Sequence, residues 1–406
     1  MRYFLAVVAT FLSLGIFAQM GCTDPVANNY DAQATTNDGS CTYDPVNVFP
    51  DVSYDLDSEV RETSGLVSWD GTLYTHNDDN DRNFYSVDPN SGFSTLALDF
   101  SIVPQVDWEE LAQDLDYFYL GDFGNNENGD RQDLRIYKVL KNSLFGGTIQ
   151  VDTIEFSYPE QTDFSGTGPN NTDFDCESMV IGTDSIYLFT KEWVSQGTAL
   201  YSLPKTGGQH QAQLLDHFNV SGLITGASAQ LDDRLIVLSG YNGQLEPFFL
   251  CLYDFTGNDF LGANKRVLSY NAQFHQIEAI STTDGITYHV TNESFAQGPV
   301  NILPKIHTFD FRDYLIHYLD PSQVGIQENE PNSVVVFPNP STEVISVQGA
   351  NNSTSYSIWD MKGQLIEKGK LDSKTSHIDI KKLPVGSYTL KLSEGATFTF
   401  QKIASK

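Results

Sequence analysis

The sequence predicts an all-β protein in which a β-propeller is followed by a small β-sandwich of the immunoglobulin type. Between Val48 and Phe311, short β-rich runs alternate with Gly, Asn, Asp and Pro, and almost no segment has helical periodicity. Five similar segments recur there, with first residues 45, 68, 48 and 53 positions apart. They are Ser64–Val67, Glu109–Ala112, Glu177–Val180, Thr225–Ser228 and Glu278–Ser281. Four-stranded units at such a period are typical of propeller blades.

Each of these segments begins a unit of strands. An apolar run ends at a polar stop 13 to 15 residues after the segment begins, and a third strand follows. Fourth strands follow in four units, at Leu96–Leu98, Ile154–Phe156, Gln213–Leu215 and Val267–Tyr270. The fifth unit lacks one, and Val52–Leu56, which precedes the first unit, has the character to supply it and close a ring. We predict five blades, with a degenerate sixth in the long gap between Glu109 and Glu177 as the alternative.

The charge of the chain is strongly acidic and uneven. The 406 residues include 23 Lys and Arg against 53 Asp and Glu, a formal net charge of -30. Such a field repels nucleic acid and anionic lipid and favours cationic partners, so we expect no nucleic-acid partner. Residues 333–406 carry nine Lys and six acidic residues, which predicts a domain boundary near Ser333. Residues 46–320 are then the propeller, 321–332 a polar linker and 333–406 the last domain.

The N-terminus has the pattern of a secretory leader. A basic start precedes an apolar run from Phe4 to Ala18, which predicts a signal peptide over residues 1–18. A membrane anchor is the alternative, but the run is shorter than the roughly 20 residues that span a bilayer. We expect no transmembrane segment in the mature chain. Acylation of Cys22 is a further alternative, although Gln19 stands where a lipobox needs an aliphatic residue.

Residues 19–45 form a short module between two cysteines. It is too short to bury a core, so in an oxidising compartment a disulfide between Cys22 and Cys41 is expected to organise it. Its Asp and Asn residues suit tight turns, and the alternative is that they ligate Ca²⁺. The segment, with Gly-Cys-Thr-Asp, Asn-Tyr and Asp-Gly-Ser-Cys in order, resembles short modules on surface proteins of Bacteroidota.

The last domain carries a specific set of motifs. Val334–Pro340 ends in Pro-Asn-Pro, Asp360–Gly363 is an Asp-x-x-Gly hairpin, Leu383–Tyr388 is a Leu-Pro-x-Gly-x-Tyr strand, and the end is basic. These motifs resemble the type A C-terminal sorting domain of the type IX secretion system of Bacteroidota. The resemblance implies passage through the periplasm, contact with the secretion machinery, and release or anchoring at the outer cell surface after the domain is removed.

The propeller offers a ladder of polar residues at the start of each inner strand. It comprises Ser64, Glu109, Glu177, Thr225 and Glu278. Because inner strands line the axis of a propeller, we expect the three glutamates to converge, and a cation or shared protons would relieve their repulsion. Oxygen donors alone suit Ca²⁺ and disfavour zinc, so calcium is the expected cofactor. The alternative is a purely structural polar lining.

A second polar ring is expected where the apolar runs stop. It comprises Asn77, Asp78, Asp122, Asn125, Lys191, Glu192, Tyr241 and Glu293. Loops on one face of a rigid scaffold often carry binding groups, and decorated turns are the alternative. Motifs for a serine nucleophile, a zinc protease or a phosphate-binding loop are not present in the sequence.

Two functions follow from these patterns. The first is a binding or adhesion module that holds a glycan, peptide or small ligand at the ring, with a calcium-binding channel. The second is a hydrolase or lyase in which channel carboxylates act as acid and base on a glycan or ester. The repeated Glu-[Ala/Ser]-[Ile/Met] segments resemble those of secreted propellers with channel calcium that carry esterase-like or phytase-like names.

Overall fold

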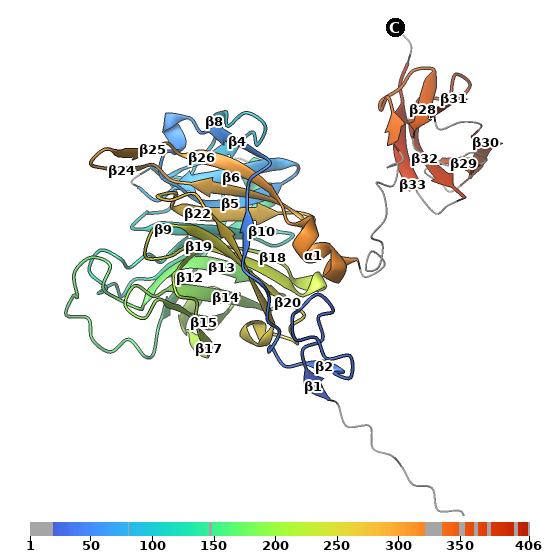
Figure 1. Cartoon of the computed structure of the whole chain (residues 1–406). Coiled ribbons are helices and arrows are strands. Elements are labelled where there is room, and N and C mark those ends of the chain that lie inside the picture. Colours follow the sequence, from blue (N-terminus) through green and yellow to red (C-terminus); the bar gives the residue numbers. More distant parts are fainter. Residues whose placement is uncertain are drawn as a thin grey trace, which may run out of the picture. The chain divides into compact units, whose positions relative to one another are not determined.

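The computed structural model divides into two units, Met1–Val324 and Gly325–Lys406 (Figure 1). The described residues are 19–79, 81–145, 148–320, 335–348, 354–360, 364–371, 375–393 and 397–404. The expected leader, 1–18, and the expected linker, 321–332, lie outside them. Among the described residues, no helix has the length and apolar character needed to cross a bilayer.

The first unit is a five-bladed propeller, as predicted. The first blade is β5–β8 (Thr63–Trp69, Thr72–Asn77, Asn83–Val87, Ser94–Asp99), and the second is β9–β12 (Trp108–Gln113, Tyr117–Asp122, Arg135–Leu140, Val151–Ser157). The third is β13–β15 with β17 (Asp175–Ile181, Ser185–Lys191, Gly197–Pro204, Gln213–Asn219), and the fourth is β18–β21 (Leu223–Gln230, Leu235–Tyr241, Pro247–Tyr253, Asn264–Tyr270). The fifth is β22, β23 and β26 with β4 (Ile277–Thr282, Thr287–Asn292, Lys305–Asp310, Val52–Asp55). The inner strands β5, β9, β13, β18 and β22 pack in that order, and β22 returns to β5.

The ring closes through β4, as the missing fourth strand predicted. This N-terminal strand pairs antiparallel with β26 of the last blade, with Asp55 opposite Lys305 and Val52 opposite Thr308. The long gap after Glu109 does not hold a sixth blade in the described part of the chain. It holds β10–β12 and loops of Asn, Gly and Asp that run on to β13.

Burial follows the position of each strand in its blade. In β19 and β20 every residue is buried, because both faces of these middle strands pack against neighbouring blades. The outer strand β17 is largely exposed, and within it only Leu215 and Phe218 are partly buried. Aromatic side chains fill the space between the first two blades, where Phe84 stacks on Phe100 with ring centroids 4.7 Å apart.

Two blades carry an additional outer strand. β16 (Gly208–Gln211) pairs parallel with β12 of the preceding blade, and β3 (Val46–Val48) pairs parallel with β21. These strands cover sheet edges that would otherwise present unpaired backbone groups. The remaining elements of this unit are the hairpin β24 and β25 (Phe295–Gln297, Val300–Ile302), the helix α1 (Arg312–Leu319), and the 3-10 turns η1 (Ser58–Val60), η2 (Lys141–Phe145), η3 (Leu231–Asp233) and η4 (Phe260–Gly262).

Every inner strand has a β-bulge near its start, and the bulge falls on the predicted ladder. The pairing of β9 with β10 skips Glu109, and the pairing of β13 with β14 skips Glu177. Thr225 and Glu278 are skipped in the same way, and Ser64 is skipped together with Gly65. A bulge leaves one residue outside the regular strand pairing and redirects its side chain, so the five polar residues occupy equivalent positions in the five blades.

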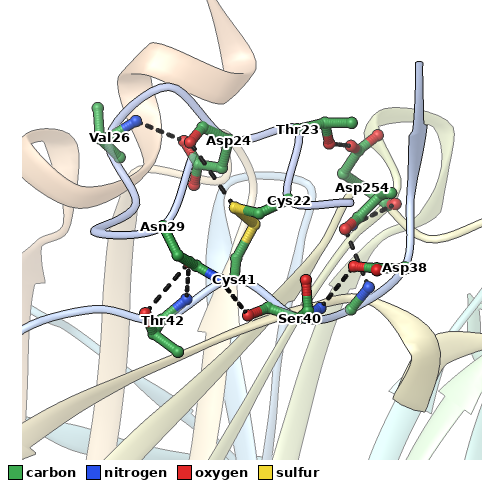
Figure 2. The surroundings of a disulfide bond; sticks show 12 residues. Cys22, Thr23, Asp24, Val26, Asn29, Asp38, Ser40, Cys41, Thr42 and Asp254 are labelled. Carbon is green, nitrogen blue, oxygen red and sulfur yellow. Dashed lines mark hydrogen bonds between the residues drawn. A yellow bond between two sulfur atoms is a disulfide. The ribbon is translucent and has the colours of Figure 1, made fainter. Parts of the chain in front are cut away.

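The N-terminal module packs on the propeller and contains the predicted disulfide between Cys22 and Cys41 (Figure 2). Its two short strands, β1 (Met20–Gly21) and β2 (Thr36–Asn37), are parallel. The carboxylate of Asp38 accepts a hydrogen bond from the Ser40 N–H at 3.0 Å, and Asp31 accepts one from Gln33 at 2.9 Å. These bonds two residues ahead are those of turn-forming Asx residues, which supports the turn interpretation over calcium ligation.

The second unit is a small antiparallel β-sandwich. One sheet has the order β27-β28-β31 (Val335–Phe337, Val344–Gln348, Thr375–Asp379) and the other has the order β30-β29-β32-β33 (Leu365–Lys370, Ser355–Asp360, Gly386–Leu392, Thr397–Lys402). Ile345, Ile358, Leu390 and Phe400 are among the buried side chains between the two sheets. The alternation of buried and exposed residues along β32 is the pattern expected of a strand with one face in a core.

Candidate functional site

A cluster of carboxylates lies where the inner strands of adjacent blades begin. Oxygen atoms of Glu109, Asp175 and Glu177 all lie within 4.8 Å of one another, and the three side chains are buried. Glu109 and Glu177 come from the bulges of β9 and β13, whereas Asp175 is the first residue of β13. The bulges therefore bring acidic groups from neighbouring blades to one place, and Glu278, the third glutamate of the ladder, lies against Glu177.

Asp175 is held in position by three donors. Its Oδ2 accepts the indole N–H of Trp193 at 2.8 Å. Its Oδ1 accepts the backbone N–H of Asn125 at 2.6 Å and that of Cys176 at 3.1 Å. These bonds fix the orientation of a carboxylate that faces two others, which is the role that outer-shell partners have around metal sites.

Glu109 differs from Asp175 in its partners. Among the described residues, its carboxylate takes part in no hydrogen bond or ion pair, although the residue is only 5% exposed. It lies against Gly124, where a Cβ atom would overlap Glu109 Oε1 and Asp107 Oδ2. Glycine at this position gives the two carboxylates room to approach the backbone. An acidic group that is buried without a donor is costly unless it is protonated or meets a cation.

Lys191 supplies a cation on the other side of the cluster. Its Nζ lies 2.6 Å from both carboxylate oxygens of Glu177 and 3.9 Å from Glu278 Oε2. The ammonium group also lies over the rings of Trp193 and Tyr241, 4.8 and 5.2 Å from their centroids. Neighbouring carboxylates raise the pKa of Lys191 well above its ordinary value despite its burial, so the side chain is charged.

The carboxyl groups around this cluster titrate far above their ordinary range. Burial, followed by repulsion from Glu177, raises the pKa of Glu109 well above its usual value. Burial and neighbouring carboxylates raise the pKa of Asp78 and Asp107 to about 7, and that of Glu293 to about 8. The site therefore holds protons near neutral pH when no other cation is present.

Glu110 closes the propeller axis. From β9, its Oε1 accepts the N–H of Leu111 at 3.0 Å, and its Oε2 accepts the N–H of Ala227, on β18 two blades away, at 3.2 Å. Beyond it lies a cavity of about 100 Å³ lined by all five inner strands, from Leu66 to Thr282. The sequence does not predict this contact across the axis, because Glu110 there is only one residue of a repeated segment.

The two hydroxyl residues of the ladder, Ser64 and Thr225, bond to the backbone and do not belong to the carboxylate cluster. Ser64 donates to the backbone carbonyl of Glu109, and Thr225 donates to that of Ile277. Each bond joins an inner strand to the next one in the ring. The hydroxyl oxygens of both residues therefore face the neighbouring backbone and not the carboxylates.

Several members of the predicted second ring also support the backbone. Asn77 bonds Glu59 and Glu62, and buried Asp122 pairs with Arg131 at 3.0 Å. Asn125 donates to Phe174 O as well as to Asp175. Glu192 points away from the cluster, where its Oε2 lies 2.7 Å from His217 Nε2. The remaining members lie around the carboxylates, since each shifts the pKa of another group there; they are Asp78, Lys191, Tyr241 and Glu293.

Sequence reasoning missed Asp107 and Asp175. Both stand two residues before a ladder glutamate, in Asp107-Trp108-Glu109 and Asp175-Cys176-Glu177. Alternate residues of a strand share a face, so this repeated Asp-x-Glu pattern was the available signal.

Comparison with known families identifies the second unit. Residues 335–406 match the secretion system C-terminal sorting domain, so the chain carries the sorting domain of type IX secretion. It is therefore secreted to the cell surface or beyond. Comparison with the curated proteins gives no match.

Solved structures similar to the chain are distant. PorZ, a surface component of the type IX secretion system of Porphyromonas gingivalis, is 12% identical with a TM-score of 0.29; the match covers 84% of this chain and 45% of PorZ. An exo-β-1,3-galactanase of Phanerochaete chrysosporium is 8% identical with a TM-score of 0.33; the match covers 93% of this chain and 97% of the galactanase. A putative 6-phosphogluconolactonase of Bacteroides fragilis is 9% identical with a TM-score of 0.31; the match covers 84% of this chain and 95% of the lactonase. Such values carry no conclusion about activity.

Proposed function

We propose that the protein is a cell-surface binding module in which Glu109, Asp175 and Glu177 hold a Ca²⁺ ion. The observation that carries the proposal is the spacing of their oxygens. Two ligands that each lie about 2.4 Å from one ion are at most about 4.8 Å apart, and the three carboxylates meet this condition. An all-oxygen donor set is typical of Ca²⁺, whereas Zn²⁺ sites use nitrogen or sulfur.

The donor set differs from the predicted one in a single member. Glu278 was expected as the third ligand, and Asp175 takes that place. Glu278 lies against Glu177 and Lys191, and Lys191 already forms an ion pair with Glu177. Because this ammonium group repels a nearby metal ion, we expect a moderate affinity, with Glu109 and Asp175 as the stronger ligands.

The ligand of the module would lie beside the ion. A cavity of about 210 Å³ is lined by Asp107, Asn126, Asn128 and Arg131, among other residues. Asp107 belongs both to this cavity and to the group of carboxylates around Glu109. Amide, carboxylate and guanidinium groups together suit the hydroxyl and carbonyl groups of a glycan or peptide.

Terbium luminescence tests the cation site directly. Trp193 touches Asp175, so Tb³⁺ bound to the cluster should emit when tryptophan is excited, and Ca²⁺ should compete with it. Glu109→Gln should abolish the emission, while Glu155→Gln, an exposed change on β12, should leave it intact. Emission that survives Glu109→Gln, or no emission from the wild type, would overturn the proposal.

Acid–base catalysis is a second candidate, supported by a different observation. The carboxyl groups of Asp78 and Glu293, with pKa values of about 7 and 8, are suited to proton transfer near neutral pH. The two candidates differ in one measurement. Turnover of glycosides or esters that is lost in Asp78→Asn without loss of Tb³⁺ binding would support catalysis over binding.

A further inference from the structure

The fourth blade has a groove at one of its two ends. The carboxylate cluster lies at the other end, where the inner strands begin. The groove is formed by three parts of the first unit: the N-terminal module, the ends of β20 and β21, and α1. Its volume is about 380 Å³, and its walls include Asp24, Pro25, Tyr253, Asn264, His317 and Tyr318. A concave site of this size, with aromatic walls and a few polar groups, is typical of small-molecule sites.

The N-terminal module is fastened to this place through Asp24. The buried carboxylate accepts the hydroxyl groups of Tyr253 at 2.6 Å and Tyr43 at 2.7 Å, and it lies 3.2 Å from Nε2 of His317. Although burial opposes its charge, these bonds lower the pKa of Asp24 below its ordinary value, so it is ionised. One side chain thus joins the module to β20 and to α1, and the disulfide next to it holds the module closed (Figure 2).

The charged groups of the groove are already paired. Asp24 is satisfied by the contacts above, and Arg234 Nη1 lies 2.9 Å from Asp254 Oδ1. The other oxygen of Asp254 accepts the Thr23 hydroxyl at 3.0 Å. An ionic ligand would have to compete with these pairs, while an uncharged one would leave them in place.

Asn264 provides a polar group without a partner. The residue is 1% exposed and lines the groove, and its carboxamide oxygen has no hydrogen-bond partner among the described residues. A buried amide in this state is unfavourable unless a ligand or water satisfies it. Beside it the partly exposed ring of Tyr318 presents apolar surface, and the fully buried ring of Tyr253 supports it with the two centroids 5.1 Å apart.

We propose that this groove binds a neutral sugar ring. The C–H face of a pyranose would pack on the ring of Tyr318, and a hydroxyl would donate to the carboxamide oxygen of Asn264. Because the charged side chains of the groove are already paired, the ligand needs no ionic group of its own. The net negative charge of the protein also disfavours anionic ligands. This site is separate from the cation site and does not depend on the function proposed for it.

Saturation-transfer NMR on the mature chain tests the proposal with glucose, galactose and N-acetylglucosamine as probes. At least one sugar should bind the wild type saturably at millimolar concentration. Tyr318→Ala should weaken that binding at least tenfold, whereas Tyr314→Ala, on the same helix but outside the groove wall, should not. Asn264→Ala is the second variant, because it removes the unpaired amide without touching α1.

The outcomes separate the two sites. Glu109→Gln should retain sugar binding, and Tyr318→Ala should retain Tb³⁺ luminescence. The proposal is overturned if none of the three sugars binds saturably, or if sugar binding is unchanged in both Tyr318→Ala and Asn264→Ala while circular dichroism shows that they are folded.

Discussion

The ammonium nitrogen of Lys191 lies 2.6 Å from each carboxylate oxygen of Glu177, and both side chains are buried. This symmetric contact places one fixed positive charge among several acidic groups. Burial raises the pKa of Glu177 well above its ordinary value, the Lys191 charge opposes that rise, and the same charge limits how much further positive charge the cluster accepts. The pair is therefore central both to the stability of the propeller and to its affinity for cations.

Removing the lysine should be costly. Lys191→Met leaves Glu177 buried without its cation, and we expect the free energy of unfolding to fall by about 3–5 kcal/mol. Adding Glu177→Gln to Lys191→Met should restore much of this loss, which denaturant titration of the three variants would measure. For comparison, Arg61→Met breaks an exposed pair with Asp79 and should cost less than about 1 kcal/mol. Equal losses in the buried and exposed variants would contradict this account.

Stability should fall as the pH rises toward 8 in the absence of divalent cations. The pKa of Asp78 rises from 3.8 to about 7 on folding, and that of Glu293 rises from 4.5 to about 8. The folded state therefore binds more protons than the unfolded state between about pH 4 and pH 8, and that stabilisation is lost as these groups ionise. The charged groups that face them are Glu62, Asp79, Asp107, Glu177, Lys191 and Glu278.

Thermal melting in chelator at pH 5, 6, 7 and 8 measures this effect. The midpoint should decrease across the series, and the decrease should be smaller in the double variant Asp78→Asn and Glu293→Gln. A midpoint that rises from pH 6 to pH 8 would show that these carboxyl groups are not protonated in the folded protein.

Loss of the disulfide should weaken the attachment of the N-terminal module. The bond between Cys22 and Cys41 spans 19 residues, and closing a loop of this length contributes about 3 kcal/mol. In the variant Cys22→Ala and Cys41→Ala, we expect faster amide exchange in residues 19–45 and weaker sugar binding at the groove. A reducing agent should have the same effect on the wild type and none on the variant, which serves as its control.

The sorting domain should be dispensable for the fold of the propeller. Truncation after Asn332 removes a unit that has a separate core, so the melting of the propeller should stay within about 2 °C of the full chain. The same truncation should abolish delivery to the cell surface, because the matched sorting region is lost. Immunoblotting of cell-surface and periplasmic fractions would measure delivery, and a large drop in melting temperature would contradict the independence of the two units.

The repeated segments made the fold predictable, because their spacing reflects a physical repeat. Ser64, Glu109, Glu177, Thr225 and Glu278 recur where each inner strand has a bulge, and the same geometry requires a residue there in every blade. The closing strand was predictable because the last unit lacked an edge. The parallel strands β3 and β16 were not, since each pairs with a strand that is distant in sequence and carries no local signal.

The site was only partly predictable. Glu109, Glu177 and Lys191 were found from their phase in the repeat. Asp175 was missed because its role depends on Trp193 and Asn125, which approach it from loops that sequence spacing does not place. Glu192 directly follows Lys191, the last residue of β14, but its side chain turns to His217 and not to the cluster. The groove could not be foreseen, since three separate parts of the chain form it.

The pairing of β4 with β26 joins Asp55 to a residue 250 positions later in the chain. Chains that end before Lys305 have no strand to receive β4, so β4 and the edge of β23 would stay exposed to aggregation and proteolysis. Contacts over such a separation also form slowly. For an exported protein, the finished ring therefore distinguishes whole chains from fragments: only a chain that has emerged through β26 conceals its own edges.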